Sequence, residues 1–556
     1  MSGHGQGSGA AGLVTNQVWF PARVSARWRP SPRVSKLAYR AALVTFMVIG
    51  VYFRSRRYWL DPLGLWVDEA VWGLRLFGRP LTGLEFRPIG YMALTKLIVR
   101  VYSDERTLRL LSYLAGLASL PLTADLAKHL FKSRVVRVLC VAVVAYNPLL
   151  IDMAREFKPY SVEFAVHLTL VWLFVRWHAA RSRGWLGALL ACLVLAFPFA
   201  YNSVFALPGI FTLLGYTFLR ERAQRALATT VLAALAALAL MAGIYLCALR
   251  GTTSDRGGTE QFWGKKYDVF YLPNAQQAHP VLARAQWLAL KYRDLATFPA
   301  SHGTALAASD SRVPSWTLQL AAVGSVAWFA LHAAGLGALL SSRRQWLLLL
   351  CGPLLVNVAF NAVSLWPFGA FRTNVFLLAY LIPIPMLGLD MLLAGGALVT
   401  RSAGGLGAVT VLLANLSSGF EPHIRKHFFC TQTEMRSLVE RIAPLRAQLP
   451  NELKLRPTMV LLDANACTPF IFEARHNDSV QRQFGALLNK ELDVRCVASF
   501  SAASELLLRG RGRPFFVVTS VNRNTSGYAR MLRSQSHIDT HEEIRGVHDL
   551  FLVTAR

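Results

Sequence analysis

Long apolar runs, separated by short polar connections, make up most of residues 37–419. Runs of spanning length begin near residues 37, 107, 134, 160, 184, 201, 226, 316, 345, 375 and 404. Since about twenty consecutive apolar residues cross a bilayer as a helix, the pattern predicts a polytopic α-helical membrane protein with about eleven transmembrane helices. No small-residue cleavage site follows the first run, 37–53, so we expect an uncleaved span rather than a signal peptide.

The pattern changes beyond residue 420. The stretches "PTMVLLDA" (457–464), "RPFFVVTS" (513–520) and "GVHDLFLVT" (546–554) are strand-like, and helical stretches lie between them. Residues 420–556 are therefore expected to form a small α/β domain. Residues 1–36 are Gly/Ser-rich and then Arg-rich without an acidic residue, which predicts a disordered basic arm.

Positive charges predict the orientation. Arg and Lys cluster in the N-terminal arm and at 128–137, 176–183 and 220–225, on alternate connections, whereas Arg54, Arg56 and Arg57 are a local exception. The positive-inside rule then predicts a cytosolic N-terminus and, with an odd number of spans, an extracytoplasmic C-terminus. The first outer loop is 54–106 and the long outer loop is 249–315. Two interfacial helices are expected in the first loop, at 70–78 and 88–102.

Composition excludes some classes of function. The chain has 556 residues, is 54% hydrophobic and carries a formal net charge of +28. Basic residues beside membrane spans account for this charge, and no nucleic-acid recognition motif accompanies it, so we expect no nucleic-acid partner. Seven cysteines show no metal-ligand spacing. A disulfide in the tail, among Cys430, Cys467 and Cys496, stays open.

The first candidate chemistry is the acidic pair Asp68–Glu69 in "LWVDEAVWG" (65–73). A solvated loop pair is the ordinary explanation, but flanking Trp66 and Trp72 place this pair at the membrane interface. Because neighbouring residues on a helix or strand point in different directions, one carboxylate is expected to face a cavity while the other makes a structural contact.

Two further loops face the same predicted side. "IDMAREFKPYSVEF" (151–164) brings Arg155, Glu156, Lys158 and Tyr160 into one turn, and "LWPFGAFRTN" (365–374) places Arg372 at the start of a span. Both could simply anchor headgroups. Together with Asp68, they supply a carboxylate base and cations beside lipid. This combination is what transfer from a lipid phosphate needs.

These motifs resemble the GT-C superfamily of polyprenyl-phosphate-sugar-dependent glycosyltransferases, in its protein O-mannosyltransferase and lipid A aminoarabinose transferase branch. The resemblance covers roughly residues 37–400. The sequence stretches that carry it are "WVDEA" (66–70), "RPIGYMALTKL" (87–97), "ERTLRLLSYLAG" (105–116), "AREFKPYSVE" (154–163) and "WPFGAFR" (366–372). Two positions depart from the family pattern: Tyr201-Asn202 stands where His-Tyr is frequent, and Lys158 where Arg is frequent.

The resemblance implies an inverting hexosyl- or pentosyltransferase in a membrane, with Asp68 as the catalytic base beside Glu69. It implies phosphate contacts for Arg155, Lys158 and Arg372, and Glu156 and Tyr160 complete the candidate substrate-binding set. The expected partners are a polyprenyl-phosphate-sugar donor, membrane lipid and a glycan, lipid or protein acceptor. A divalent cation stays open. The Ala/Leu/Arg-rich composition favours a bacterial inner membrane.

A transporter or lipid flippase is the alternative, because His167, His332 and Asp390 lie within apolar runs. Transporters, however, place their key ionisable groups near the bilayer midplane, often in paired broken helices. Here the densest polar clusters lie in the predicted outer loops, which favours the transferase.

Overall fold

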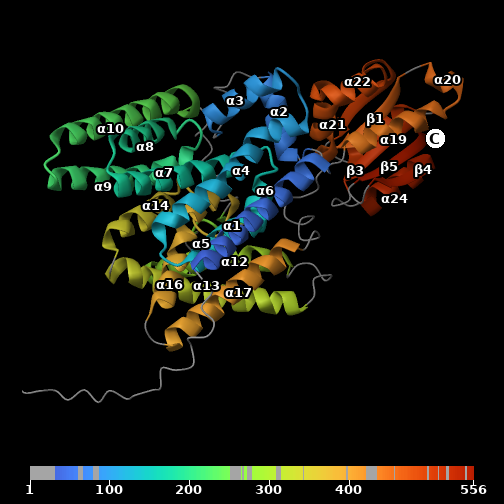
Figure 1. Cartoon of the computed structure of the whole chain (residues 1–556). Coiled ribbons are helices and arrows are strands. Elements are labelled where there is room, and N and C mark those ends of the chain that lie inside the picture. The colour runs from blue at the N-terminus through green and yellow to red at the C-terminus, as the bar shows by residue number, and fades with distance from the viewer. Residues whose placement is uncertain are drawn as a thin grey trace, which may run out of the picture.

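The computed structural model describes residues 32–60, 65, 67–78, 87–250, 264–265, 268–271, 279–307, 315–341, 343–395, 398–420, 435–455, 457–497, 500–510, 512–520, 525–544 and 548–555. These residues form a long helical bundle, with a small α/β unit at one end of it (Figure 1). Most of the predicted basic arm, together with Trp66 and Cys430, lies outside the described residues.

Each of the eleven predicted runs is helical in the structure. These helices are α1 (Pro32–Ser55), α4 (Glu105–Leu130), α5 (Arg134–Tyr146), α7 (Tyr160–Ala180), α8 (Arg183–Leu195), α9 (Leu207–Arg220), α10 (Gln224–Ile244), α13 (Ser315–Ser341), α14 (Arg344–Ala362), the continuous η6 (Arg372–Leu377), α15 (Leu378–Leu381) and α16 (Pro383–Ala394), and α17 (Leu398–Phe420). In the described part of the chain, six helices are long and apolar enough to cross a membrane. The expected polytopic helical membrane fold is confirmed.

Five shorter elements and one long helix complete the bundle. The short ones are η1 (Arg56–Leu60), α6 (Pro148–Met153), η3 (Tyr201–Phe205), η4 (Tyr245–Leu249) and, in the loop before η6, a turn at 363–371. The long one is α12 (Pro280–Ala307), inside the segment expected as an outer loop. It packs on α13 and buries Leu295 and Phe298. Charged residues such as Lys291 and Asp294 interrupt its apolar sequence, so the hydrophobic pattern does not predict a membrane span here.

In the described part of residues 54–106, the predicted first outer loop, two α-helices precede α4, as expected. They are α2 (Val67–Gly78) and α3 (Ile89–Val99); α2 lies between the bundle and the C-terminal unit, whereas α3 lies farther from that unit and packs on α4 (Figure 1). Asp68 and Glu69 occupy the first turn of α2. Acidic side chains there interact favourably with the positive end of the helix dipole, so the acidic pair also helps α2 to begin where it does.

The C-terminal unit is built on a five-stranded sheet in the order β2-β1-β3-β5-β4. β1 pairs in parallel with β2 and β3, whereas β5 is antiparallel to both β3 and β4. The strands are β1 (Thr458–Asp463), β2 (Leu492–Val497), β3 (Pro514–Ser520), β4 (Ser536–Ile544) and β5 (His548–Ala555). The three predicted strands are confirmed as β1, β3 and β5.

Helices cover both faces of this sheet. Alternate residues of each central strand point to opposite faces, so Val460 packs with α19 and α21 whereas Leu461 packs with α23 and α24. The helical elements are α19 (Met435–Ala447), α20 (Asn451–Lys454), α21 (Ala464–His476), α22 (Asp478–Ala486), η7 (Leu487–Glu491), α23 (Phe500–Arg509) and α24 (Thr525–Gln535). A disulfide joins Cys467 of α21 to Cys496 of β2.

The C-terminal unit docks on α2 through α21. The ring of Phe472 packs against Gly73 of α2, so closely that a Cβ at Gly73 would lie 2.7 Å from Phe472 Cε2. One turn further along α2, Phe77 stacks on His476 with ring centroids 4.4 Å apart. The helix that carries the acidic pair is thus clamped between the bundle and the C-terminal unit.

Polar contacts at the start of α4 extend this interface. Asp478 donates its backbone N–H to Ser103 O at 2.8 Å, and Ser103 N donates to Asp478 Oδ2 at 2.7 Å. Asn477 Nδ2 donates to Glu105 Oε2 at 2.8 Å. These groups are largely buried, so their pairing removes the cost of leaving polar atoms unsatisfied.

Candidate active site

The acidic pair diverges in the structure. On an α-helix, residues four apart share a face and adjacent residues do not. Asp68 therefore shares a face of α2 with Trp72, and Glu69 shares the next face with Gly73. The side chain of Asp68 is 44% exposed, whereas that of Glu69 is fully buried. One carboxylate is accessible and the other is not, as the sequence pattern predicts.

Three separate segments meet at Asp68. Its Oδ2 lies 3.4 Å from Lys158 Nζ and 3.8 Å from Arg372 Nη2. Lys158 is only 4% exposed and Arg372 18%, so both cations are held by the protein around the more accessible carboxylate. An anionic group could bind to these cations directly beside the carboxylate.

Trp72 organises the same face of α2. Lys158 Nζ lies 4.0 Å from the centroid of its ring, and Arg87 Cζ lies 3.9 Å from that centroid. Cation–π contacts of this kind hold cations without neutralising their charge. Arg87 is a buried site residue that our sequence reasoning left without a role. The signal for it was present, since Arg87 opens the "RPIGY" motif that supports the resemblance.

Glu69 connects α2 to two other elements. Arg109 of α4 donates to it through Nε at 2.9 Å and through Nη2 at 2.6 Å, and Phe157 donates its backbone N–H to the same carboxylate. Phe157 immediately precedes Lys158. Glu69 therefore fixes the turn that carries Lys158 relative to the helix that carries Asp68. Arg109 is another residue that our sequence reasoning missed.

The turn after α6 buries two ionisable groups. Burial raises the pKa of Glu156, and the nearby carboxylates of Glu69 and Asp152 raise it further. Burial lowers the pKa of Lys158, against the opposing effect of Asp68. Within the described residues, Glu156 Oε2 accepts no hydrogen bond. This environment favours a neutral Glu156 and weakens the hold of Lys158 on its proton.

The remaining residues of this turn lie in different surroundings. Arg155 forms an ion pair with Asp152 and donates through Nε to Ile151 O at 3.2 Å. Tyr160 begins α7 and interacts electrostatically with Arg372 and Asp68. Phosphate contact by Arg155 stays a prediction, because its guanidinium has a local carboxylate partner in the structure.

Arg372 follows a turn that is held by side-chain hydrogen bonds. Gly369 has φ +117°, a conformation that side-chain-bearing residues rarely adopt. Asn374 Nδ2 donates to Pro367 O at 3.1 Å and to Gly369 O at 2.9 Å, and Asn374 Oδ1 accepts from Trp366 Nε1 at 3.1 Å. The amide of Asn374 thus folds the loop back onto the start of η6. Arg372 is placed at that start.

The part of the chain that the structure describes contains no group of three or more His, Cys, Asp or Glu side chains that could hold a metal ion. Asp68 has cations as its neighbours rather than further carboxylates. We therefore assign no metal ligands at this site.

Residues 87–246 match the family model of the dolichyl-phosphate-mannose-protein mannosyltransferases. The resemblance to the GT-C glycosyltransferases is confirmed. The matched segment begins at Arg87 and includes Arg109, Glu156 and Lys158, whereas Asp68 and Arg372 lie on either side of it. None of the curated proteins matches the chain significantly.

Solved GT-C structures are similar to the chain at low sequence identity. ArnT from Cupriavidus metallidurans bound to undecaprenyl phosphate is 14% identical, with a TM-score of 0.45, over 94% of this chain and 98% of that one. The Archaeoglobus fulgidus oligosaccharyltransferase in the apo form is 12% identical, with a TM-score of 0.45, over 90% of this chain and 71% of that one. AglB from Archaeoglobus fulgidus with an inhibitory peptide and a dolichol-phosphate is 12% identical, with a TM-score of 0.42, over 93% and 74%.

Proposed function

We propose that the chain is an inverting membrane glycosyltransferase that moves a sugar from a polyprenyl-phosphate donor to an acceptor hydroxyl, with Asp68 as the general base. One observation carries the proposal: an accessible carboxylate on α2 lies within 4 Å of a cation from the 154–159 turn and of another from the start of η6. The match to a family named for a lipid-phosphate-sugar donor supports a donor of this class.

The chemistry follows from these groups. Asp68 takes the proton of the acceptor hydroxyl as its oxygen attacks the anomeric carbon. The bond from that carbon to the phosphate oxygen breaks, and the polyprenyl phosphate leaves with the electron pair. Lys158 and Arg372, with Arg87 nearby over Trp72, stabilise the negative charge of the leaving phosphate. No further group is needed for a single displacement.

Inversion is supported by the surroundings of the other carboxylates. A retaining double displacement needs two carboxyl groups that converge on the sugar, about 5–5.5 Å apart. Glu69 is fully buried in its pair with Arg109, and Glu156 is buried in the 154–159 turn. Of these three carboxylates, Asp68 is the accessible one, and it lies beside two cations. We assign Glu69 the role of a positioning residue.

The transporter alternative loses support from the partners of its candidate residues. His167 contacts Tyr380 Oη at 2.7 Å and Asn202 Oδ1 at 3.2 Å, and His332 Nε2 lies 2.9 Å from Tyr292 Oη. His167 is thus bonded through both ring nitrogens, as a satisfied group of a helix core is, whereas within the described residues His332 is bonded through Nε2 alone. Asp390 is buried and accepts the backbone N–H groups of Lys132 and Ser133, whereas Asp68 is accessible at the loops around α2.

The sidedness of the site is also a proposal. A structural disulfide such as Cys467–Cys496 forms and persists in oxidising compartments, which supports an extracytoplasmic C-terminal unit and, with it, an extracytoplasmic Asp68. Together with the alternating basic connections, this supports a cytosolic N-terminus. Membrane-impermeant thiol labelling of single cysteines introduced at Ser2 and at Ser534 should report opposite sides; labelling from the same side would rule this orientation out.

Arg372 provides the test of the phosphate site. Arg372→Ala should weaken binding of the polyprenyl-phosphate donor by roughly 10- to 150-fold, the equivalent of losing hydrogen bonds to a charged group. Arg372→Lys should recover only part, because lysine lacks the planar fork of arginine. Arg344→Ala, an exposed arginine at the opposite end of the bundle, is the matched control. If both Arg372 variants bind donor like the parent, the residue only anchors the loop at the membrane.

A further inference from the structure

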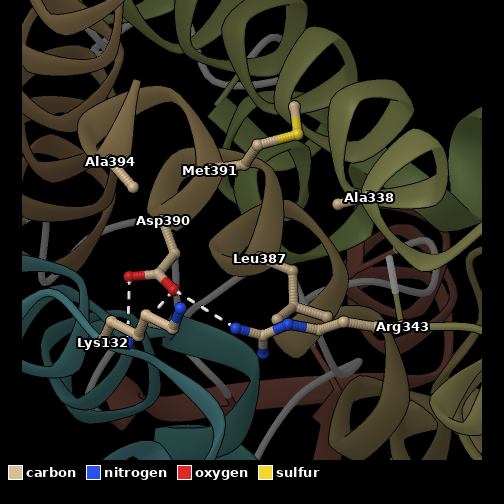
Figure 2. A pocket seen from close by; sticks show the side chains of 7 residues that line it. All are labelled: Lys132, Ala338, Arg343, Leu387, Asp390, Met391 and Ala394. Atoms are coloured by element: carbon tan, nitrogen blue, oxygen red, sulfur yellow. Dashed lines mark hydrogen bonds and ion pairs between the residues drawn. The ribbon is translucent and has the colours of Figure 1, made fainter. Parts of the chain in front are cut away.

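A cavity lies away from Asp68, between α13, α16 and the connection from α4 to α5. It has a volume of about 300 Å³ and is lined by Lys132, Ala338, Arg343, Leu387, Asp390, Met391 and Ala394. Figure 2 shows Asp390 between Lys132 and Arg343, with Met391 and Ala338 on the other side. Nothing in the proposed glycosyl transfer uses this cavity.

The cavity is at the opposite end of the bundle from Asp68. Arg372 and Asp390 belong to one candidate span, Arg372–Ala394, and a helix rises 1.5 Å per residue, so their Cα atoms are roughly 27 Å apart. This separation is close to the thickness of the hydrocarbon core, about 30 Å. Lys132 likewise follows the far end of α4, the helix whose start lies beside the Asp68 site. The cavity therefore opens at the other headgroup layer.

Asp390 sets the charge of the cavity. Its carboxylate accepts the backbone N–H of Ser133 at 2.8 Å and that of Lys132 at 3.1 Å, and it lies 3.7 Å from Arg343 Nη2. The bond from Lys132 uses the backbone, so the lysine side chain is left to line the cavity wall. Two cationic side chains thus face one carboxylate whose oxygens are already occupied by N–H donors. The cavity keeps a net positive charge.

The guanidinium of Arg343 is fixed in place, since its Nη1 donates to Leu130 O at 2.6 Å. A cation held in this way loses less freedom when an anion binds. The other wall of the cavity is apolar: Leu387 and Ala338 are buried, whereas Met391 is 44% exposed on the outer surface of the bundle. The cavity combines a cationic end with an apolar rim that opens toward lipid.

We propose that this cavity binds the phosphate headgroup of an anionic membrane lipid in the leaflet opposite the Asp68 site. Basic pockets between transmembrane helices bind anionic headgroups in this way. The phosphate lies against Lys132 and Arg343, and the adjoining acyl chain lies along Met391. Arg134, Arg137 and Arg344 lie at the same end of the helices and raise the local concentration of anionic lipid. Free phosphate shares the headgroup chemistry, but it would leave the apolar rim unused.

Native mass spectrometry of the full-length protein, titrated with phosphatidylglycerol in a non-ionic detergent, tests the proposal. Lys132→Ala should weaken lipid binding by about fivefold, the effect of one basic residue at a lipid surface, whereas Lys132→Arg should bind like the parent. The substitution keeps the backbone bond to Asp390, so the fold should be retained. Lys128→Ala is the matched control, because Lys128 lies at the same end but outside the cavity lining.

A second titration with inorganic phosphate distinguishes the two sources of the anion. Binding of phosphatidylglycerol that depends on Lys132, with no saturable binding of inorganic phosphate, supports a lipid site. Equal lipid binding by the parent and Lys132→Ala would overturn the proposal. Saturable binding of inorganic phosphate that depends on Lys132, without dependence for the lipid, would overturn the lipid assignment and leave a site for small anions.

Discussion

Glu69 and Arg109 form a buried, two-bond ion pair between α2 and α4, with N–O distances of 2.9 and 2.6 Å. The same carboxylate accepts the backbone N–H of Phe157, the residue before Lys158. A single buried side chain thus joins the helix of the proposed base, the next long helix of the bundle and the turn of a proposed phosphate-binding cation. The geometry around Asp68 depends on this pair.

Breaking the pair should therefore cost stability first. Glu69→Gln removes one charge of a buried ion pair, which typically costs about 3–5 kcal/mol. We expect a clear drop in the thermal unfolding temperature in detergent, and a fall in turnover through the displaced Lys158. The double variant Glu69→Gln/Arg109→Gln should lose less stability than the sum of the two single changes. Strict additivity would show that the two side chains do not interact in solution.

Gly73 should report on the docking of the C-terminal unit. In Gly73→Ala the added methyl meets the Phe472 ring at 2.7 Å, closer than real contacts, so either α2 or α21 must shift. We expect reduced turnover with donor binding less affected, because α2 carries Asp68. In the double variant Gly73→Ala/Phe472→Leu, the smaller leucine replaces the aromatic ring and makes room for the methyl group, so part of the activity should be restored. A Gly73→Ala variant with the turnover of the parent would show that this interface does not position α2.

The pH dependence of donor use should follow Lys158. Burial lowers the pKa of Lys158 below the ordinary lysine value of about 10.4. The ammonium form, which binds phosphate, is therefore lost as pH rises through that lowered pKa, and kcat/KM for the donor should fall over the same range. Lys158→Arg keeps its charge throughout, so its profile should be flat there. An unchanged alkaline limb in Lys158→Arg would assign the titration to another group.

The sequence predicts the helical bundle well because a membrane span is recognised by one property, the length of its apolar run. All eleven apolar runs are helical, since a buried backbone in lipid must satisfy its own hydrogen bonds. Helix α12 was not predicted from the apolar pattern, because charged residues such as Lys291 and Asp294 interrupt that pattern. Strands β2 and β4 were not predicted either, because they form the edges of the sheet and carry polar residues such as Asp493 and Glu542.

The candidate site is predictable only in part. Helical periodicity alone separates Asp68 from Glu69, and loop position alone brings Lys158 and Arg372 to the same predicted side of the membrane. The partners Arg109, Arg87 and Trp72 depend on how α2 packs against α4 and the 154–159 turn. Such long-range pairings leave no periodic signal in one sequence. The pairing of Arg155 with Asp152 is different: the two residues are three positions apart, a spacing at which side chains on one helical turn meet.

The most direct test of the central claim is the turnover of Asp68→Asn with donor binding measured in parallel. The amide keeps the shape of the side chain and removes its basicity, so glycosyl transfer should fall by about 10²–10⁴, the usual contribution of a general base, while binding of the polyprenyl-phosphate donor is retained. Glu69→Gln, compared at equal amounts of folded protein, should lose less turnover. If Asp68→Asn transfers sugar at the rate of the parent, Asp68 is not the base and the proposed mechanism is wrong.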